Sequence, residues 1–194
     1  MKIAMYPGSF DPVTLGHLNI IERAAEVFDR VIVCVMTNSD KSPIFTGEER
    51  VDFVRRVTAH LPNVEADVNK GLVAEYAKQH GSKVIVKGLR AVSDFENEFQ
   101  MALINKSINP ELETMFMAAD AKYTYLSSTV AKEMGRYHVS LDGFIPAAII
   151  EDVVKRFDEI SRFSSGVWTR RTHLPLYSTV LQRNPNRGCK VLHY

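Results

Sequence analysis

Residues 6 to 17 read YPGSFDPVTLGH and hold groups suited to binding phosphate. The two glycines leave room for an anion at the backbone, Ser9 and Thr14 supply hydroxyl donors, and His17 supplies an imidazole. An apolar run before this stretch and a helical apolar repeat after it predict a strand, a turn and a helix N-terminus, which favours an anion. A tight turn capped by Thr14 would use the same residues, so both interpretations stay open here.

Three cations stand at further turns that follow apolar runs. Lys41 lies in the polar loop Thr37 to Ser42, where a lysine is commonly just solvated. Lys87 and Arg90 flank a glycine at the end of an apolar run, which suits a phosphate clamp. A surface charge pair would produce the same pattern, so these cations alone do not decide between the two.

A run of rings and hydroxyls, YTYLSST, occupies residues 123 to 129 just before a predicted helix. These groups are able to bind phosphate or simply to cap that helix. Asp94, Glu96 and Glu98 stand close together earlier in the chain and raise the alternative of a metal site. Their place at a predicted helix start favours dipole stabilisation instead, with Ser93 and Glu96 as a capping pair.

Apolar runs alternate with segments of helical periodicity along the chain. The predicted strands are Lys2 to Met5, Arg30 to Met36, Val64 to Val68, Val84 to Lys87 and Glu113 to Met117. The predicted helices begin near Leu18, Thr46, Leu72, Ser93, Ser128 and Pro146. Thr46 and Glu49 form a capping-box pattern, the helix from Ser128 is expected to end near Arg136, and the last helix is expected to end near Ser161. This alternation predicts an α/β fold: a single Rossmann-like, doubly wound parallel five-stranded sheet with helices on both faces and a C-terminal helix. Ligands are then expected at the carboxyl ends of the strands.

The composition is that of one folded domain. At 194 residues, 45% hydrophobic and 24% charged, the chain is expected to form one catalytic domain over residues 1 to 163. Those residues carry 19 Lys and Arg against 23 Asp and Glu, a net charge of −4, so no nucleic-acid partner is expected. Cys34 and Cys189 indicate neither a disulfide scaffold nor a zinc site. Without a secretory signal or a run of ~20 apolar residues, a cytoplasmic protein with no membrane partner is expected.

Residues 164 to 194 differ from the rest of the chain. They hold five basic residues and no acidic ones, and their prolines and glycines interrupt any apolar period. This pattern predicts an irregular or disordered basic tail. A nucleic-acid-binding arm, a strand-like segment docked on another subunit and an extension foreign to the ancestral gene all stay open, and the last is our preferred interpretation.

Three segments resemble the signatures of a known family. GSFDPVTLGH at residues 8 to 17 is similar to the first signature of the nucleotidyltransferase superfamily, whose T/H-x-G-H element binds the phosphates of ATP or CTP. KGLRAVSDFE at residues 87 to 96 and LSSTVAKE at residues 126 to 133 resemble later signatures of one branch, the phosphopantetheine adenylyltransferases. The segments stand in the family's order, and the similarity runs from about Lys2 to Phe163.

The resemblance implies an activity and its partners. Members of this branch transfer the adenylyl group of ATP to 4′-phosphopantetheine, giving dephospho-coenzyme A and pyrophosphate in coenzyme A biosynthesis. Mg²⁺ is expected to accompany ATP, held largely by phosphates and water rather than by protein ligands. The same resemblance implies a homohexamer.

The resemblance also implies roles for single residues. His17 becomes the catalytic residue, stabilising the transition state at the α-phosphate, while Lys41, Val73 and Lys87 contact the acceptor together with Ser9. Family members commonly carry arginine where this chain has Lys87, which leaves the geometry of that contact open. The expected ATP-binding residues are Ser9, Phe10, His17, Gly88, Leu89, Arg90, Glu98, Tyr123, Thr124, Tyr125, Leu126, Ser127, Ser128 and Thr129.

Two other functions stay open on the sequence. Another nucleotidyltransferase, acting for example on nicotinamide mononucleotide, would share His17 and the strand–turn–helix but not the block from Lys87 to Glu98. A non-catalytic nucleotide-binding module would keep the glycines but would have no need of His17, Lys41 and Arg90 together.

Overall fold

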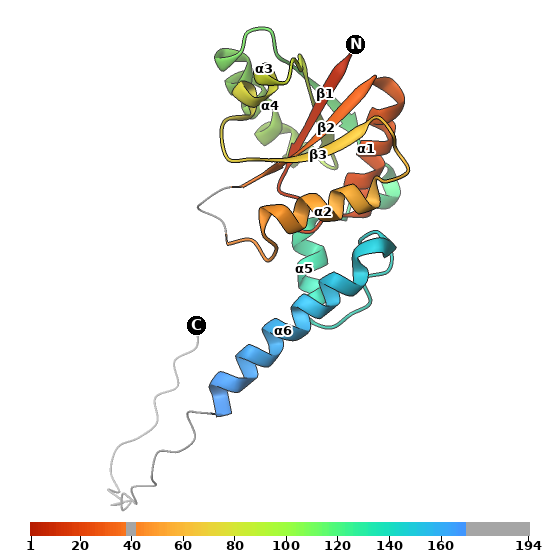
Figure 1. The fold of residues 1–194 in the computed structure, drawn as a ribbon, viewed down its shortest axis with the longest axis vertical. Coiled ribbons are helices and arrows are strands. Elements are labelled where there is room, and N and C mark those ends of the chain that lie inside the picture. Colours follow the sequence, from red (N-terminus) through yellow and green to blue (C-terminus); the bar gives the residue numbers. More distant parts are fainter. Residues whose placement is uncertain (38–41, 170–194) are drawn as a thin grey trace, which may run out of the picture.

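The computed structural model describes residues 1–37 and 42–169, the last six of these as backbone only. Five parallel strands form one sheet in the order β3-β2-β1-β4-β5 (Figure 1), which confirms the predicted fold class. The strands are β1 (Ile3–Gly8), β2 (Arg30–Met36), β3 (Val64–Asn69), β4 (Val84–Leu89) and β5 (Glu113–Ala118).

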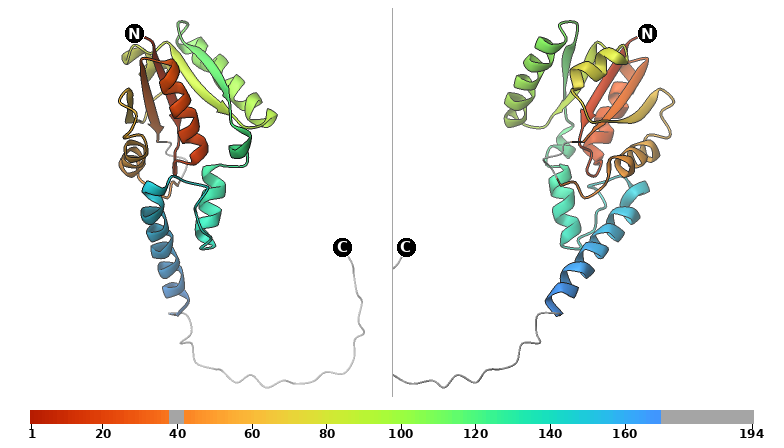
Figure 2. Two further views of the ribbon diagram at one scale, coloured as in Figure 1. Left: turned by 90° about the vertical axis from the view of Figure 1, so that its right-hand side faces the viewer. Right: turned by 60° about the vertical axis from the view of Figure 1, so that its left-hand side comes forward.

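Helices cover both faces of the sheet. In the chain as described they are α1 (Leu15–Val27), α2 (Gly47–Val57), α3 (Val73–Gln79), α4 (Val92–Ile108), α5 (Ser128–Arg136) and α6 (Ile150–Thr169). Figure 2 shows α1 and α2 on one face and α3 and α4 on the other, with α5 and α6 beyond the carboxyl edge of the sheet. Within the described ranges, no helix is both long and apolar enough to cross a bilayer.

Strand β2 is one apolar run whose side chains enter two hydrophobic clusters. Val31, Val33 and Val35 belong to the larger cluster beneath α1 and α2, whereas Ile32 and Cys34 belong to the smaller cluster beneath α3. A parallel strand buried on both faces is apolar at every position, because alternate side chains enter opposite cores. The sequence RVIVCVM therefore predicts the bounds of this strand correctly.

Two strands run two or more residues further than the sequence predicts, and β3 and β5 each run one residue further, to Asn69 and Ala118. Pro7 and Gly8 were expected to end β1, but both pair with β2 in register with Cys34 and Val35. The β1–β4 pairing stops at Met5, so the proline stands where β1 has a partner on one side only, a place where its missing N–H is tolerated. Strand β4 likewise continues through Gly88 and Leu89.

The predicted N-terminal cap of α4 is wrong. The helix begins at Val92 after Ala91, which makes no side-chain cap, so Ser93 and Glu96 are not a capping pair. Asp94 instead accepts a hydrogen bond from the backbone N–H of Arg90, at 3.1 Å. A carboxylate in the first turn of α4 thus accepts a hydrogen bond from a backbone N–H that precedes the helix.

Helix α6 extends eight residues past its predicted end near Ser161, to Thr169. Ser164, Ser165 and Gly166 have low helix propensity, but adding a residue to an existing helix is far easier than nucleating one. The first six residues of the predicted irregular tail are therefore helical. Residues 170–194, including Cys189, lie outside the described residues, and the expected boundary at Phe163 stays a prediction.

Candidate active site

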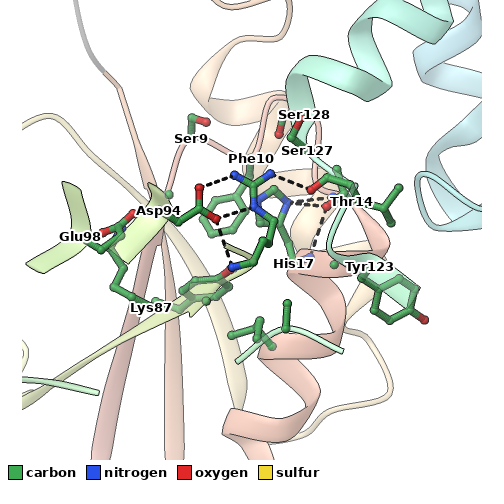
Figure 3. A pocket seen from close by; sticks show the side chains of 18 of the residues that line it. Ser9, Phe10, Thr14, His17, Lys87, Asp94, Glu98, Tyr123, Ser127 and Ser128 are labelled. Carbon is green, nitrogen blue, oxygen red and sulfur yellow. Dashed lines mark hydrogen bonds and ion pairs between the residues drawn. The ribbon is translucent and has the colours of Figure 1, made fainter. Parts of the chain in front are cut away.

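A cavity of about 340 Å³ lies at the carboxyl ends of β1 and β4, the point where the strand order reverses. The first turns of three helices, α1, α4 and α5, contribute to its wall (Figure 3). Helix N-termini carry unpaired N–H groups and a partial positive charge. The fold therefore directs three positive helix ends at one cavity, an arrangement that suits an anion with several phosphates.

The imidazole of His17 is oriented by the helix cap. Thr14 is the N-cap of α1, and its backbone N–H donates to His17 Nδ1 at 3.0 Å, while its side chain accepts from the His17 backbone N–H. Because a backbone N–H only donates, Nδ1 must be the acceptor and the ring proton resides on Nε2. The side chain lines the cavity, so the cap leaves the cavity a neutral donor of fixed orientation.

Two features keep His17 uncharged. Burial, together with the positive charges of Arg90 and Lys87, lowers its pKa from the ordinary 6.5 to about 4. Its ring also packs edge-on against Phe10, with the ring centroids 5.1 Å apart. Near pH 7 the ring therefore acts as a hydrogen-bond donor and not as an acid.

Lys87 lies at the end of β4 and pairs with a carboxylate. Its Nζ is 3.0 Å from Glu98 Oε2 on α4 and donates to the carbonyl of Pro7 at 3.4 Å. Both side chains of the pair are mostly buried, at 20% and 28% exposed. A buried cation beside one carboxylate is neutralised in this state, so an incoming phosphate must share or replace Glu98.

Arg90 is held more completely than Lys87. Its Nε and Nη2 donate to the two oxygens of Asp94, at 3.0 and 3.1 Å, and its Nη1 donates to the carbonyl of Leu126 at 2.9 Å. The first contact is the two-pronged geometry that guanidinium and carboxylate share. Together these contacts fix the guanidinium between the start of α4 and the loop before α5.

The turn after β1 has an unusual backbone. Phe10 has a φ of +47°, in the left-handed region, and its ring is fully buried. A Cβ at Gly8 would lie 2.9 Å from the end of that ring, so glycine is required there by packing. Ser9 between them is exposed and lines the cavity.

The hydroxyl run before α5 is partly used by the fold. Ser127 is the N-cap of α5, and its side chain accepts from the Val130 backbone N–H at 3.1 Å. Ser128 donates its hydroxyl to the carbonyl of Pro12 at 2.8 Å, which ties α5 to the turn after β1. The capping interpretation is thus correct for Ser127, and both serines still line the cavity together with Thr129.

Comparison with known proteins adds the family. Residues 5–134 match the cytidylyltransferase-like family. A phosphopantetheine adenylyltransferase from Clostridium botulinum (strain Alaska E43 / Type E3) is 50% identical over 156 residues, which are 80% of this chain and 98% of the relative. Another, from Desulforudis audaxviator (strain MP104C), is 52% identical over 149 residues, which are 77% of this chain and 91% of the relative. The chain belongs to the phosphopantetheine adenylyltransferase family.

Membership of this family confirms the resemblance of the three signatures and favours the first of the three functions left open by the sequence. A solved structure from Vibrio parahaemolyticus, described as a candidate nicotinate-nucleotide adenylyltransferase, matches with a TM-score of 0.58 at 18% identity. That match covers 80% of this chain and 96% of the other, and it shows the same fold.

The cavity gathers most of the residues that the sequence singles out. Lys41 lies outside the described residues. Val73, the first residue of α3, packs against the smaller core cluster. The predicted residues absent from the cavity wall are Leu89, Thr124, Tyr125 and Val73. The predicted residues that line it are Ser9, Phe10, His17, Lys87, Gly88, Arg90, Glu98, Tyr123, Leu126, Ser127, Ser128 and Thr129.

The sequence analysis did not predict some of the residues that line the cavity. Asp94 was interpreted as a helix-start carboxylate, although its spacing of four from Arg90 was a usable signal for an ion pair. Tyr6 and Asn97 also line the cavity, and neither has a local signal that separates it from a buried strand residue or a surface helix residue. Burial raises the pKa of Tyr6, and the charge of Glu98 adds to that rise, so its phenol stays protonated.

Proposed function

We propose that this chain joins ATP and 4′-phosphopantetheine to give dephospho-coenzyme A and pyrophosphate, with the cavity at β1 and β4 as its active site. The observation that supports this most is the convergence of a neutral His17 donor, two cations and three helix N-termini on one cavity in a member of this family. These groups match a reaction whose substrates and products are all phosphates.

The chemical step requires no general base. An oxygen of the acceptor phosphate attacks the α-phosphorus of ATP, a new P–O bond forms, and the bond to the bridging oxygen of pyrophosphate breaks. The attacking oxygen is already deprotonated near pH 7, because the second phosphate pKa is about 6. Catalysis then consists of alignment and of neutralising charge on the transferring and leaving groups.

His17 acts at the transferring phosphate. Its Nε2–H donates to an oxygen of the α-phosphate as charge builds there, and the cap from Thr14 keeps the ring in one orientation. A donor that is already in place costs no reorganisation when the transition state forms. The lowered pKa also keeps Nδ1 unprotonated near pH 7, so it still accepts the hydrogen bond from Thr14 that orients the ring.

The cations divide the two substrates between them. Lys87, with Lys41 and Val73 by resemblance, serves the acceptor, and Arg90 serves the ATP phosphates together with the α5 N-terminus. Ser9 and Phe10 stand between the two ligands. The other ATP contacts in this proposal are Gly88, Leu89, Glu98, Tyr123, Thr124, Tyr125, Leu126, Ser127, Ser128 and Thr129.

Magnesium enters with the nucleotide in this proposal. Among the described residues, no group of three or more His, Cys, Asp and Glu side chains could hold a metal ion. Mg²⁺ binds readily through phosphates and retained water, and it would neutralise part of the triphosphate charge. Asp94 and Glu98 line the cavity and carry carboxylates of the kind that binds Mg²⁺, but both are paired with cations.

The chain forms a homo-oligomer in this proposal, a hexamer by resemblance. Helix α4 lines the cavity with Asp94 and Glu98, but its apolar side chains are exposed in the single chain. Apolar patches of this kind mark protein interfaces. Leu103→Glu should therefore reduce the mass measured by light scattering. The exposed apolar residues on α4 and β5 are Val92, Phe95, Phe99, Met101, Leu103, Ile104, Ile108 and Met115.

The deciding experiment is an assay of pyrophosphate release from ATP. With phosphopantetheine the rate should be high, and with nicotinamide mononucleotide it should stay at background. Release with the second acceptor but not the first would indicate a different nucleotidyltransferase. ATP binding without release with either acceptor would indicate a non-catalytic module.

A further inference from the structure

A buried arginine outside the cavity joins the turn after β1 to both ends of the β2–α2 connection. Arg50, in the first turn of α2, is 2% exposed, although a guanidinium is always charged. Its Nη1 donates to the carbonyls of Ser9 at 2.6 Å and Met36 at 3.0 Å, and its Nε donates to the carbonyl of Thr46 at 3.2 Å. Arg50 does not line the cavity, so substrate contact does not account for its burial.

A buried carboxylate makes the complementary contacts. Asp11 is 4% exposed, and its two oxygens accept from the backbone N–H groups of Phe45 at 3.0 Å and Ile44 at 3.2 Å. It also pairs with Lys132 of α5 at 3.0 Å. Burial lowers the pKa of Arg50, and the negative charges of Asp11 and Glu48 partly oppose that shift.

Together these side chains fix both ends of the connection between β2 and α2. Met36 is the last residue of β2, and residues 44 to 46 lead into α2. Hydrogen bonds from Arg50 or to Asp11 hold the backbone at each end. Ser9, whose carbonyl Arg50 also holds, contacts the acceptor in the proposed function.

The same side chains hold the strained turn after β1. A non-glycine residue in the left-handed region is strained and persists only where its surroundings fix it. Phe10 has that backbone, with Arg50 on the carbonyl before it and Asp11 directly after it. We call Arg50 and Asp11 together the clamp. Because Ser9 and Phe10 line the cavity, the clamp determines where these two residues lie.

We propose that Arg50 and Asp11 are positioning residues for the acceptor, acting through the turn after β1 and the ends of the β2–α2 connection without touching either substrate. This inference rests on the proposed function. Of the many proposed ATP contacts only Ser9 and Phe10 lie in the held turn, and the others come from α1, β4, α4 and residues 123–129, whereas Ser9 is one of the few acceptor contacts. Weakening the clamp should therefore impair acceptor binding more than ATP binding.

The test compares Arg50→Lys with Arg55→Lys. Arg55 is on the same helix and donates to the carbonyl of Ala66 in β3, outside the cavity wall. Arg50→Lys should raise KM for phosphopantetheine about tenfold, because a lysine keeps the charge but not the fork that reaches three carbonyls. KM for ATP should change less than about threefold, and Arg55→Lys should change neither.

A second variant, Asp11→Asn, tests the same positioning role. Asp11→Asn preserves size and one oxygen acceptor but removes the charge, and it should shift the ratio of the two KM values in the same direction. If Arg50→Lys does not fold, Asp11→Asn decides. A purely structural role would lower Tm and leave the KM ratio unchanged, and that result in folded variants would overturn the proposal.

The wild-type protein assayed in parallel separates two kinds of failure. An active wild type whose variants keep their KM ratio contradicts the positioning role alone. A wild type that releases no pyrophosphate with phosphopantetheine contradicts the proposed function, and with it the assignment of an acceptor to this clamp.

Discussion

The cavity has two walls that hold their donors differently. On the α1 wall, formed by Thr14, Gly16 and His17, the donor is neutral and a backbone hydrogen bond fixes its ring. On the β4 wall, Lys87 and Arg90 carry full charges, and each is already paired with a carboxylate from α4. The α1 wall is preorganised for the transition state, whereas the β4 wall must exchange partners when an anion binds.

The β4 wall also treats its two cations differently. Arg90 is held by both oxygens of Asp94 and by the carbonyl of Leu126, so its fork has one orientation. Lys87 has a single carboxylate partner, Glu98, and a flexible stem. Arg90 therefore suits a fixed nucleotide phosphate, and Lys87 suits an acceptor that must be brought into line.

The largest expected effect comes from removing the α1 donor while keeping its cap. His17→Ala removes the imidazole, and Thr14 still caps the helix by accepting from the backbone N–H of residue 17, so the fold should survive. The kcat should fall at least ~100-fold, as for loss of one oxyanion-type donor, with a smaller change in KM for ATP. Steady-state kinetics with circular dichroism measures both properties.

Glu49→Ala is the matched control for that variant. Glu49 is the corresponding residue of the α2 capping box, paired with Thr46, and it does not line the cavity. This variant should keep kcat within about twofold of wild type, because it removes no group from the cavity. A folded His17→Ala protein with near-normal kcat would remove His17 from the mechanism.

A smaller effect is expected on the β4 wall. Lys87→Ala should raise KM for phosphopantetheine about tenfold through loss of a charge-assisted contact, while Lys87→Arg should keep KM equal or lower it. The assay varies phosphopantetheine at saturating ATP for the three proteins. Equal KM values for alanine and lysine would show that Lys87 is not an acceptor contact.

The neutrality of His17 predicts a modest dependence of stability on pH. Between pH 6.5 and about 4 the unfolded chain binds a proton at this histidine that the folded chain does not. The free energy of unfolding therefore rises with pH in this window and falls as the pH drops through it. His17→Ala has no such group, so its Tm should decline less than that of wild type between pH 7 and pH 5.

Carboxylates with lowered pKa values, such as Glu49, Asp67 and Asp94, also destabilise the fold in acid, but they are common to both proteins. The difference between the two declines isolates His17. Equal declines in Tm would mean that His17 is not held neutral by the fold.

The smallest expected effect lies far from both walls. Chains ending at Phe163 and at Thr169 should match the full chain in kcat/KM, because among the described residues every one that lines the cavity precedes Val130. Val153 and Phe157, the residues of α6 up to Phe163 that are buried, also precede both ends, and Phe163 is 79% exposed. A tenfold loss of activity or a marked fall in Tm for either chain would show that the segment beyond it belongs to the working structure.

Much of the fold follows from local pattern. The run from Arg30 to Met36, the capping box of Thr46 with Glu49, and the helix Ser128 to Arg136 appear in the structure with the predicted bounds or partners. Each depends on neighbours within a few residues, where periodicity and capping rules apply. Predictions that depended on turn residues were less accurate, because Pro7 and Gly88 stay within strands that pairing extends.

The kinds of group at the site are also readable from sequence. Glycine-rich turns, hydroxyl runs and cations after apolar strands indicate phosphate binding, and three signatures indicate the family. The sequence alone therefore determined the fold class, the reaction class and most of the residues that line the cavity.

Only the tertiary structure decided how these groups pair. The pairing of Lys87 with Glu98, the contact of Arg90 with Leu126 and the clamp of Arg50 on Ser9 join segments that are distant in the chain or lie on different elements. Strand order and burial bring such segments together, and no local pattern encodes either. The protonation state of His17 belongs to the same class, because it depends on burial and on charges that the fold places beside it.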